Sequence, residues 1–499
     1  MKPDDDNAIA SLASGKPALV WRSAIADTET PVSAALKLIE SGRGDFLLES
    51  VEGGAVRGRY SLIGLAPDLV FRAHGAAAEI NNQWLTDREA FAPLTESTLP
   101  ALRSLVASCR IDVPDGLPGV LACLVGYFGY ETVGLVEDLP RPPANPLNLP
   151  DMMFVRPTLI LVFDRLADRL FMVAPVWPGG DPEKQVALAL DRIDAASARL
   201  AQPLPQVAPT NVTDLPDPSP VLAPGRYGEM VASAKNYIAA GDIFQVVLAQ
   251  RFTLPFALPA FDLYRALRRI NPSPFLYHLD LPGFALTGSS PEILVRARDG
   301  EVTIRPIAGT RPRGKTAAED SENRASLLAD PKERAEHLML LDLGRNDVGR
   351  VTTSGSVTVT DSYTVEYYSH VMHIVSNVVG QLAPGKDALD ALFAGFPAGT
   401  VSGAPKVRAC QVIAELEPET RGAYAGGVGY FSPDGSMDSC IVLRTAVVKD
   451  GVMHVQAGAG IVADSDPASE QRECEAKAGA LIAAAREAVT RSNEAGFGQ

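Results

Sequence analysis

Two pairs of glutamates are the residues of this chain best suited to hold a metal ion. Glu333 and Glu336 form one pair, and Glu470 and Glu473 form the other. A spacing of three puts both members of a pair on one face of a helix, and facing carboxylates repel one another unless a hard divalent cation lies between them. Oxygen ligands of this kind favour Mg²⁺ over zinc. Such pairs are also common on solvated helix faces, so the spacing leaves both interpretations open.

Two glycine-containing segments could bring backbone N–H groups to a ligand. Residues 399–406 read Gly-Thr-Val-Ser-Gly-Ala-Pro-Lys, and Pro405 favours the first turn of a helix. The free N–H groups of such a helix start can hold an anion, although an ordinary N-cap would use the same residues. Residues 457–460, Ala-Gly-Ala-Gly, end a β-type segment. Glycine there either permits a close approach of backbone to ligand or marks only a turn.

Two polar residues interrupt apolar strands. His373 lies within the segment Val-Met-His-Ile-Val at 371–375, and Gln245 lies within an apolar segment at 244–248. A buried amide or imidazole destabilises the fold unless it finds hydrogen-bond partners. Each of these residues therefore either has its partners within the core or points into a site.

The elements that must position these residues are best defined in the second half of the chain. Apolar residues at 227–238 repeat with helical spacing, and Gly241 follows as a natural stop. A strand is expected at 243–252, and a mostly antiparallel sheet is expected around it. Hairpin turns are predicted by Asp-Gly pairs at 299–300, 434–435 and 450–451. Covering helices are predicted at 318–328, 331–343, 386–394, 404–416 and 466–491.

A proline-rich stretch divides the chain. Seven prolines lie between residues 203 and 224, where little apolar periodicity is present. We expect an N-terminal domain at 17–202, a linker at 203–223 and a larger domain at 224–490. The N-terminal part alternates short β-type segments with turns and ends in an amphipathic helix at 182–200, which is an α+β pattern. Residues 1–16 are expected to fray.

Composition narrows the class of protein. The formal net charge of −15 argues against a nucleic-acid or acidic-membrane partner, and any anion site must therefore be made positive locally. The longest apolar run, 119–130, is too short to cross a bilayer and is expected to be buried. Five scattered cysteines without paired or metal-type spacing indicate buried thiols in a reducing compartment. We infer a cytoplasmic protein.

In order and spacing, the motifs resemble those of the chorismate-utilising enzymes and, among them, the large subunits of anthranilate synthases. The resemblance covers nearly all of 224–482 and implies two antiparallel β-sheets packed across each other as a β-sandwich, with helices outside and the active site between the sheets. Its motifs are Gly-Asp-Ile-Phe-Gln-Val-Val-Leu at 241–248, Ser-Pro-Glu at 290–292, Pro-Ile-Ala-Gly-Thr-Arg-Pro-Arg-Gly at 306–314, Glu-His at 336–337, Asp-Leu-Gly-Arg-Asn-Asp at 342–347 and the 399–406 turn.

The resemblance implies how the two carboxylates of chorismate are held. It places the ring carboxylate on a Mg²⁺ ion bound by Glu336 and Glu473, with Glu333 and Glu470 supporting them, so the metal interpretation becomes the favoured one. The enolpyruvyl carboxylate would meet Arg444, whose planar fork suits a carboxylate. The implied substrate-binding set is Gly309, Thr310, Tyr424, Arg444, Gly458, Ala459, Gly460 and Lys477.

The resemblance also implies two chemical steps. Ammonia attacks C2 of the ring while the C4 hydroxyl leaves, and Glu292 matches the general acid. A carboxyl can act in this way near neutral pH only if its pKa is raised. The aminodeoxyisochorismate intermediate then loses pyruvate and becomes anthranilate, and His373 matches the residue tied to that elimination. Thr400 lies nearby.

Two positions distinguish sister reactions. Enzymes of this group that add water have a lysine base where Gln245 stands; a glutamine cannot be that base, but it can orient ammonia. Aminodeoxychorismate synthases, the nearest alternative, resemble Pro-Ile-Lys-Gly-Thr, whereas this chain has Ala308, whose methyl group cannot attack a substrate. A non-catalytic amino-acid sensor on the same fold is a second alternative, against which the intact Glu292, Glu336, His373 and Glu473 argue.

A feedback site and a partner subunit are implied as well. A tryptophan-binding site is expected where Leu-Leu-Glu-Ser at 47–50 meets Asn-Pro-Ser-Pro-Phe-Leu at 271–276, so inhibition would couple two separate sites. No Gly-Cys-Gly nucleophile turn of a glutamine amidotransferase is present in the sequence. Ammonia would then come from a separate small subunit in a hetero-oligomer. The expected tryptophan site comprises Leu48, Glu49, Ser50, Asn271, Pro272, Ser273, Phe275 and Leu276.

Three positions depart from the usual pattern of these enzymes. Gln471 replaces a tyrosine between the glutamates, Ala476 replaces an asparagine before Lys477, and Ala249 stands where serine is common. None of them removes a proposed ligand, but they change the groups that would support the metal ligands.

Overall fold

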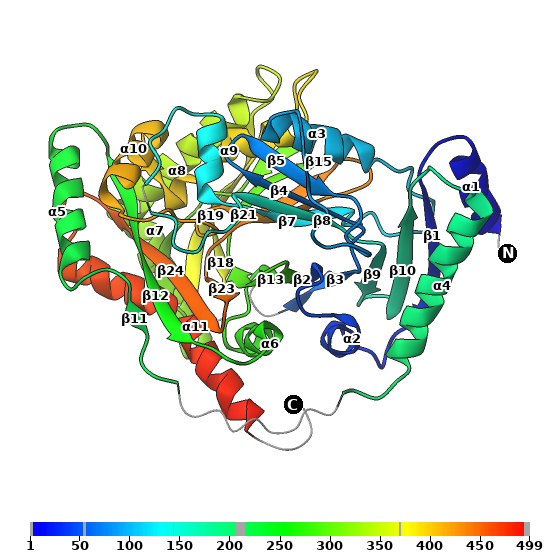
Figure 1. Cartoon of the computed structure of the whole chain (residues 1–499). Coiled ribbons are helices and arrows are strands. Elements are labelled where there is room, and N and C mark those ends of the chain that lie inside the picture. The colour runs from blue at the N-terminus through cyan, green and yellow to red at the C-terminus, as the bar shows by residue number, and fades with distance from the viewer. Residues whose placement is uncertain (1–2, 53–55, 143, 206–214, 369–370, 494–499) are drawn as a thin grey trace.

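Two large antiparallel sheets packed face to face form the centre of the molecule. The computed structural model describes residues 3–52, 56–142, 144–205, 215–368 and 371–493. Within these ranges each sheet has 12 strands, and helices lie outside both sheets (Figure 1). The expected α+β sandwich is therefore confirmed.

One sheet, sheet A, joins strands from both ends of the chain. Its N-terminal strands meet its C-terminal strands where β2 pairs with β13. In pairing order it runs β1 (Ala18–Ile25), β10 (Arg169–Val176), β9 (Leu159–Asp164), β3 (Val56–Leu65), β2 (Asp45–Glu52), β13 (Phe275–Leu281), β14 (Phe284–Ser290), β23 (Thr445–Lys449), β24 (Val452–Ile461), β12 (Gln245–Pro255) and β11 (Ser219–Pro220), with β20 (Gly403–Ala404) beside β12.

The second sheet, sheet B, is joined in the same way, where β21 pairs with β7. In pairing order it runs β17 (Ile307–Pro312), β19 (Val371–Gln381), β16 (Glu301–Ile304), β15 (Ile293–Arg298), β22 (Met437–Ile441), β21 (Gly427–Phe431), β7 (Leu124–Phe128), β8 (Met152–Arg156), β4 (Leu69–His74), β5 (Ala77–Asn81) and β6 (Ala92–Pro93), with β18 (Thr358–Tyr367) beside β19.

Helices cover the outer faces of the sheets. In Figure 1, α11 and α6 lie beneath the C-terminal half of sheet A, and α4 lies against its N-terminal edge. The helices are α1 (Pro3–Ala13), α2 (Pro31–Leu38), α3 (Thr98–Ser108), α4 (Pro182–Leu200), α5 (Arg226–Ala239), α6 (Ala260–Ile270), α7 (Ala317–Ala329), α8 (Pro331–Gly349), α9 (Ala388–Gly395), α10 (Lys406–Leu416) and α11 (Pro467–Ser492), with short 3₁₀ turns η1 (Tyr130–Leu135) and η2 (Gly399–Val401).

Local sequence signals explain many of these boundaries. The three Asp-Gly turns each join paired strands, β15 to β16, β21 to β22 and β23 to β24, as predicted. Asp330 caps α8 by accepting hydrogen bonds from the N–H groups of Lys332 and Glu333, and Pro331 occupies the first turn. The five predicted covering helices are also present. Two of these helices, α9 and α10, were predicted to start two residues too early, at 386 and 404, because the capping residues stand outside each helix.

The N-terminal segment does not fray, and that prediction is wrong. Residues from Pro3 onward form α1, which packs on β1 and α4. Ala8 and Leu12 are buried, and Arg22 of β1 donates to both carboxylate oxygens of Asp5, each at 2.9 Å. The prediction counted the acidic residues but not the apolar positions at a spacing of four, which form one buried helix face.

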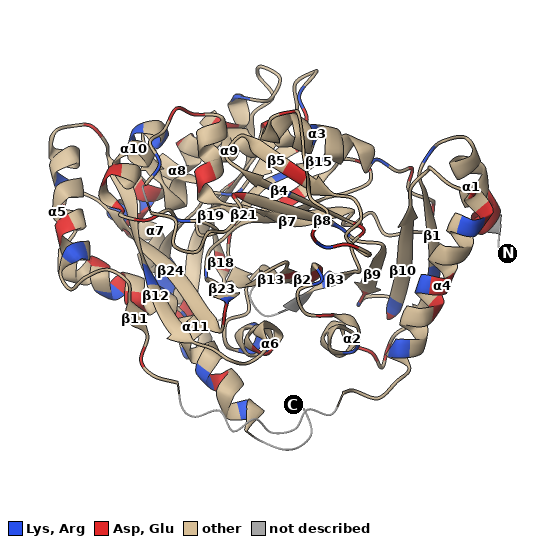
Figure 2. Ribbon diagram, viewed as in Figure 1, with Lys and Arg blue, Asp and Glu red and all other residues tan. Residues whose placement is uncertain are grey.

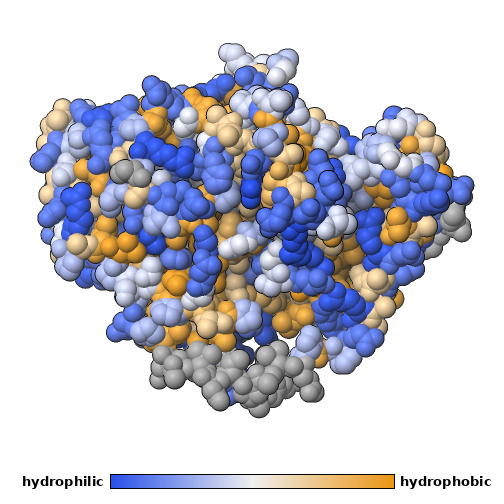
Figure 3. All heavy atoms as spheres, in the orientation of Figure 1, coloured by the Kyte–Doolittle hydropathy of each residue, from blue (hydrophilic) through white to orange (hydrophobic). Residues whose placement is uncertain are grey.

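The core is made of several clusters: one lies between the two sheets, and others pack helices against the sheets, such as α4 and α11 against sheet A. Phe46, Leu62 and Val162 of sheet A pack in one cluster with Val125 and Tyr127 of sheet B. Charged residues lie largely on the helices and loops around the strands (Figure 2). The face in Figure 3 is mostly hydrophilic, with scattered apolar residues. Across the described ranges, each helix is too short or too polar to span a membrane.

The two parts predicted on either side of the proline-rich stretch do not form separate sheets, because both parts contribute strands to each sheet. Residues 17–202 contribute strands to sheets A and B, and so do residues 224–490. Of the proline-rich stretch, 206–214 lies outside the described residues, and Ser219–Pro220 forms β11 at the edge of sheet A.

Candidate active site

Glu292 and Arg444 lie on two neighbouring segments that cross between the sheets. Glu292 stands between β14 of sheet A and β15 of sheet B, and Arg444 stands between β22 of sheet B and β23 of sheet A. The segments are tied together, because the N–H of Ile441 donates to the Glu292 carbonyl at 3.1 Å and the N–H of Ser289 donates to the Arg444 carbonyl at 3.1 Å. The sequence thus brings an acid and a cation to one place between the sheets.

The Glu292 carboxyl is buried and weakly compensated. It is 8% exposed, and the Thr400 hydroxyl donates a hydrogen bond to its Oε1 at 3.0 Å. Burial raises the pKa of Glu292 to about 8, although the Thr400 bond and the Arg444 charge both oppose the shift. Glu292 also lines a cavity together with Thr400, Pro306 and Leu340. Glu292 can therefore hold a proton at neutral pH and deliver it to a group in the site.

His373 is held as a neutral imidazole. It lies on β19, and its Nδ1–H donates to the Gly309 carbonyl at 3.0 Å, which leaves Nε2 with a lone pair. The Thr310 hydroxyl lies 3.1 Å from the same nitrogen. Burial lowers the pKa of His373, and the nearby Arg444 lowers it further. The ring can therefore act as a base.

A bulge makes the carbonyl of Gly309 available to His373. The register of β17 against β19 shifts between Ala308 and Thr310, and Gly309 between them has a φ of +72°. A side chain is strained in that conformation, which explains the glycine. A Cβ there would also come within 3.0 Å of the Glu333 carboxylate, so Gly309 adjoins the glutamate pairs.

Two glycines of β24 admit larger side chains into the site. A Cβ on Gly458 would lie 2.8 Å from the Tyr424 hydroxyl, and one on Gly460 would lie 2.7 Å from Nε2 of Gln245. Ala459 between them pairs with Leu248 of β12. The Lys477 ammonium donates to the Gly458 carbonyl at 2.8 Å. The 457–460 segment is therefore strand rather than turn, and the glycines serve close approach.

The two glutamate pairs face each other from α8 and α11. Burial raises the pKa of Glu336, and the charges of Glu333 and Glu473 raise it further, which shows that the carboxylates crowd one another. Glu333 is bonded by Arg311 at 2.8 Å and Glu473 by Lys477 at 2.7 Å. Within the described residues, groups of three or more His, Cys, Asp or Glu side chains already arranged around a metal position are absent. The donor chemistry, carboxylate oxygens with surplus negative charge, fits Mg²⁺.

Most of the segment expected to bind tryptophan is assembled within sheet A. Phe275 pairs with Ser50, Leu276 with Glu49, and Tyr277 with Leu48, while Asn271 and Ser273 are buried just before β13. Pro272 stands between those two residues. The Nδ2 of Asn271 is buried and, within the described residues, has no hydrogen-bond partner.

Glu49 is the charged centre of this second region. It is 6% exposed, and Arg268 binds both of its oxygens, at 2.6 and 3.1 Å. The Tyr264 hydroxyl donates at 2.6 Å, and Arg165 forms a further ion pair. Burial would raise the pKa of Glu49, but these partners outweigh burial and lower it.

Sequence reasoning missed Tyr368 and Arg421. The Tyr368 ring packs edge-on against His373 with centroids 5.3 Å apart, and its hydroxyl donates to Glu366 at 3.0 Å. Tyr368 is the second of two adjacent tyrosines at the end of β18, the strand that pairs with the strand of His373. This pair of aromatic residues was the available signal. Arg421 is buried beside Tyr424. A charged residue directly before the Gly-Ala-Tyr-Ala-Gly-Gly segment at 422–427 was the signal there.

Comparison with known proteins agrees with this geometry. The family model of chorismate binding enzymes matches residues 47–483. The chain is 51% identical to anthranilate synthase component 1 of Cereibacter sphaeroides over 97% of each chain, and 47% identical to that of Thermus thermophilus over 92% of this chain and 96% of the relative.

Solved structures of related enzymes resemble this chain as well. Anthranilate synthase component I from Streptococcus pneumoniae superposes with a TM-score of 0.73 at 36% identity, covering 85% of this chain and 92% of that one. The menaquinone-specific isochorismate synthase of Escherichia coli, at 20% identity and a TM-score of 0.70, shares the fold. The chain belongs to the chorismate-binding enzyme family.

Proposed function

We propose that this chain converts chorismate and ammonia to anthranilate and pyruvate, as the chorismate-converting component of an anthranilate synthase. The observation that carries the proposal is the buried Glu292 carboxyl, placed between the sheets beside Arg444 and Thr400 with its pKa raised to about 8. The names of the relatives that align over nearly the whole chain agree with it.

Glu292 acts in the first step. Ammonia adds to the ring of chorismate as a hydroxyl group leaves, and the departing oxygen needs a proton that a raised-pKa carboxyl can supply. Gln245 lies against Gly460 at the start of β12, where its amide can accept a hydrogen bond from ammonia. A glutamine cannot remove a proton from water, so addition of water is disfavoured at this site.

His373 acts in the second step. The amino-substituted intermediate loses a ring proton and the enolpyruvyl group, and the ring becomes aromatic. The Nε2 lone pair of His373, fixed by the Nδ1–H bond to Gly309, is the group suited to take the ring proton. Tyr368 packs against the imidazole and restrains its orientation.

Arg444 and Tyr424 hold a carboxylate of the substrate. Arg444 is half-buried, and desolvation lowers its pKa, so an anion that binds there gains a charge-assisted hydrogen bond in a partly dehydrated environment. The Tyr424 hydroxyl beside Gly458 supplies a second donor. A dianionic substrate therefore finds local positive charge on a chain of net charge −15.

Mg²⁺ belongs to the proposal. Glu336 and Glu473 are the proposed ligands, with Glu333 and Glu470 in support, and the ion would neutralise the second carboxylate of the substrate when bound. Glu336→Gln should abolish turnover at any Mg²⁺ concentration while the circular dichroism spectrum stays unchanged. Full activity of that variant, or full activity of the wild-type chain after chelation, would reject the metal.

The proposal also includes a partner subunit, a regulator and a location in the cell. The relatives are called component 1, which supports a second component that supplies ammonia from glutamine. The paired segments around Ser50 and Phe275, with the Asn271 Nδ2 that has no partner among the residues described, support a tryptophan site. Five free, buried cysteines support a cytoplasmic location.

Anthranilate fluorescence tests the reaction. Purified chain is incubated with chorismate and Mg²⁺, with either ammonium at alkaline pH or glutamine, and with or without tryptophan. The proposal predicts anthranilate with ammonium but not with glutamine, and less of it when tryptophan is present. Consumption of chorismate without anthranilate would favour aminodeoxychorismate or isochorismate formation, and untouched chorismate would favour a sensor.

A further inference from the structure

Arg421 is a buried cation at the junction of three elements that carry site residues. It follows α10, precedes β21 and is 3% exposed. Its Nη1 donates to the Val401 carbonyl at 2.7 Å, and its Nη2 donates to the Val247 carbonyl at 2.7 Å. Val401 belongs to η2 and Val247 to β12, so one guanidinium bridges two segments far apart in sequence.

The charge of Arg421 is balanced from its own loop. Glu417 accepts from Nε at 2.9 Å and from Nη2 at 2.6 Å. The same carboxylate accepts from the N–H of Ala249 at 2.8 Å, which adds a second tie to β12. Glu131 in turn accepts from the backbone N–H groups of Arg421 and Gly422 at 2.7 and 3.0 Å, so the loop itself is anchored to η1.

The bridged segments lead directly to the reacting groups. Thr400, the donor to Glu292, immediately precedes Val401. The guanidinium also lies 5.6 Å from the ring centroid of Tyr424, whose N–H donates to the Arg421 carbonyl at 3.3 Å. A shift of Arg421 would therefore move two groups together: the Thr400 hydroxyl, which bonds to Glu292, and the Tyr424 hydroxyl, which lies beside Gly458.

A charge-neutralising role alone does not account for this arrangement. An ion pair with Glu417 would use one edge of the guanidinium, yet the remaining edge is directed at two backbone carbonyls on different elements. The planar fork of arginine fixes the angle between these bonds, and the ammonium of lysine cannot reproduce it. Neither Val401 nor Val247 is among the proposed substrate-binding residues, so Arg421 acts through its neighbours.

We propose that Arg421 is a positioning residue that holds Thr400 against Glu292 and Tyr424 against β24 by bridging Val401 and Val247. The inference rests on the proposed function for its catalytic consequence, but the restraint on 398–404 is a property of the folded chain alone. It can therefore be measured whether or not the chain makes anthranilate.

Arg421→Lys is the main test, because it keeps the charge beside Glu417 and loses the fork. We expect faster hydrogen exchange in the peptide covering 398–404, and a kcat lower by about 100-fold with KM changed much less, since a misplacement of about 1 Å near the chemistry has this effect. Glu417→Gln retains both carbonyl bonds of Arg421 and should keep kcat within a fewfold of the wild type.

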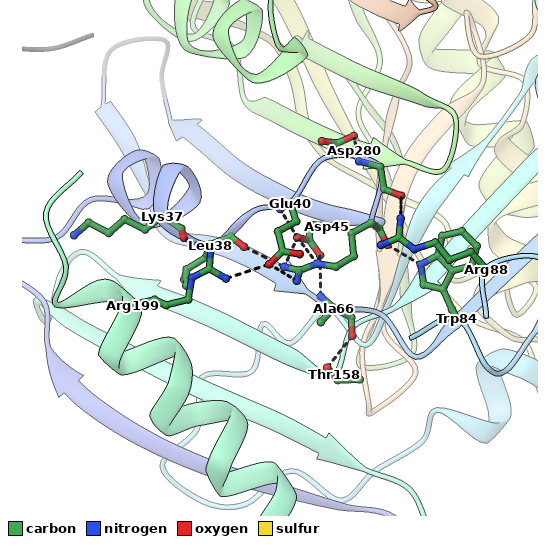
Figure 4. A network of polar contacts seen from close by, with 12 residues as sticks. Lys37, Leu38, Glu40, Asp45, Ala66, Trp84, Arg88, Thr158, Arg199 and Asp280 are labelled. Carbon is green, nitrogen blue, oxygen red and sulfur yellow. Dashed lines mark hydrogen bonds and ion pairs between the residues drawn. The ribbon is translucent and has the colours of Figure 1, made fainter. Parts of the chain in front are cut away.

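The matched control is a second arginine–carboxylate pair, in which the carboxylate is buried and the arginine side chain is 15% exposed. Arg43 binds the buried Asp45, which lies in a polar network at the N-terminal half of sheet A (Figure 4). Arg43→Lys should lower the melting temperature without changing exchange at 398–404 or kcat. If it changes both as Arg421→Lys does, general destabilisation explains the effect and the positioning role is rejected.

A double variant keeps the test decisive if Arg421→Lys fails to fold. Arg421→Met with Glu417→Met removes both buried charges together, a change that folded proteins commonly tolerate. It should still lose kcat and protection at 398–404. Wild-type exchange in this peptide, in either variant, would overturn the inference. An inactive wild-type chain would instead reject the proposed function, and hydrogen exchange at 398–404 alone would then decide whether Arg421 restrains the segment.

Discussion

Glu292 and Glu49 are equally buried glutamates with opposite electrostatics. The first is 8% exposed and the second 6%. Glu292 receives one hydroxyl hydrogen bond and has its pKa raised to about 8. Glu49 receives two arginines and a tyrosine hydroxyl, and its pKa is lowered.

The difference lies in the partners, because burial acts on both carboxyls in the same direction. Desolvation alone raises a carboxyl pKa, and only charged or hydrogen-bonding neighbours reverse the shift. Near Glu292 the close cation among the described residues is Arg444, which in our proposal is directed to a substrate carboxylate. The site between the sheets thus keeps a proton available, whereas the region around β2 and β13 keeps a fixed anion.

The largest expected effect is on turnover by Glu292→Gln. Removing a general acid lowers kcat by about 10²–10⁴-fold, whereas Glu49→Gln should leave kcat with ammonium within a fewfold of the wild type. Anthranilate fluorescence at saturating chorismate measures both. Equal losses in the two variants would mean that the regions are not functionally separate, and the comparison would fail.

Glu49→Gln should instead act on stability. Removing the carboxylate leaves Arg268 and Arg165 partly buried without their counter-charge, which lowers the free energy of unfolding by about 3–5 kcal/mol. Denaturant unfolding measures the change. The control is Glu79→Gln, which breaks the surface pair between Arg72 and Glu79. The Arg72 side chain is 34% exposed and the Glu79 side chain is 39% exposed. This variant should change the free energy of unfolding by less than about 1 kcal/mol.

Glu292→Gln should stabilise the fold, and more so at higher pH. The folded chain keeps the Glu292 proton up to about pH 8, whereas the unfolded chain releases it above its ordinary pKa of 4.5. Folding therefore takes up a proton in this window, and wild-type stability falls as pH rises through it. At pH 7 the variant should be more stable by about 3 kcal/mol, because each pH unit above the unfolded pKa costs the wild type about 1.36 kcal/mol. Melting curves at pH 4 and pH 7 with an unchanged difference would contradict the raised pKa.

The sequence predicted the hairpins and helix starts well because their signals are local, whereas the sandwich itself was implied by the resemblance to the chorismate-utilising enzymes. Asp-Gly turns between β-branched segments produce hairpins wherever they lie, and Pro331 after Asp330 starts a helix without help from distant residues. Predictions failed where burial decided the outcome. The acidic start of α1 was expected to fray, but its apolar face is covered by α4 and β1.

The candidate site divides in the same way. Residue types and family motifs were sufficient to select Glu292, His373 and Arg444, but not to foresee that two crossovers between the sheets bring the first and last together. Arg421 was missed because its importance comes from backbone carbonyls on other elements, and a carbonyl has no signature in the sequence. Glu49 was selected as part of a binding segment, yet its saturation by Arg165 and Arg268 depends on distant positions.

The smallest expected effect concerns the hydrogen bond that the Thr400 hydroxyl donates to the Glu292 carboxylate. The Thr400 hydroxyl favours the ionised form, so Thr400→Val should raise the pKa of Glu292 further, by up to about one pH unit if the bond contributes about 0.5–1.5 kcal/mol. Because the acid must be protonated to act, the alkaline decline of kcat should move to higher pH in this variant and return in Thr400→Ser. The profile has to be measured at saturating free ammonia, so that ionisation of ammonium does not enter. A lower kcat with an unmoved alkaline decline would mean that Thr400 only packs the η2 turn and that its hydroxyl does not influence the pKa of Glu292.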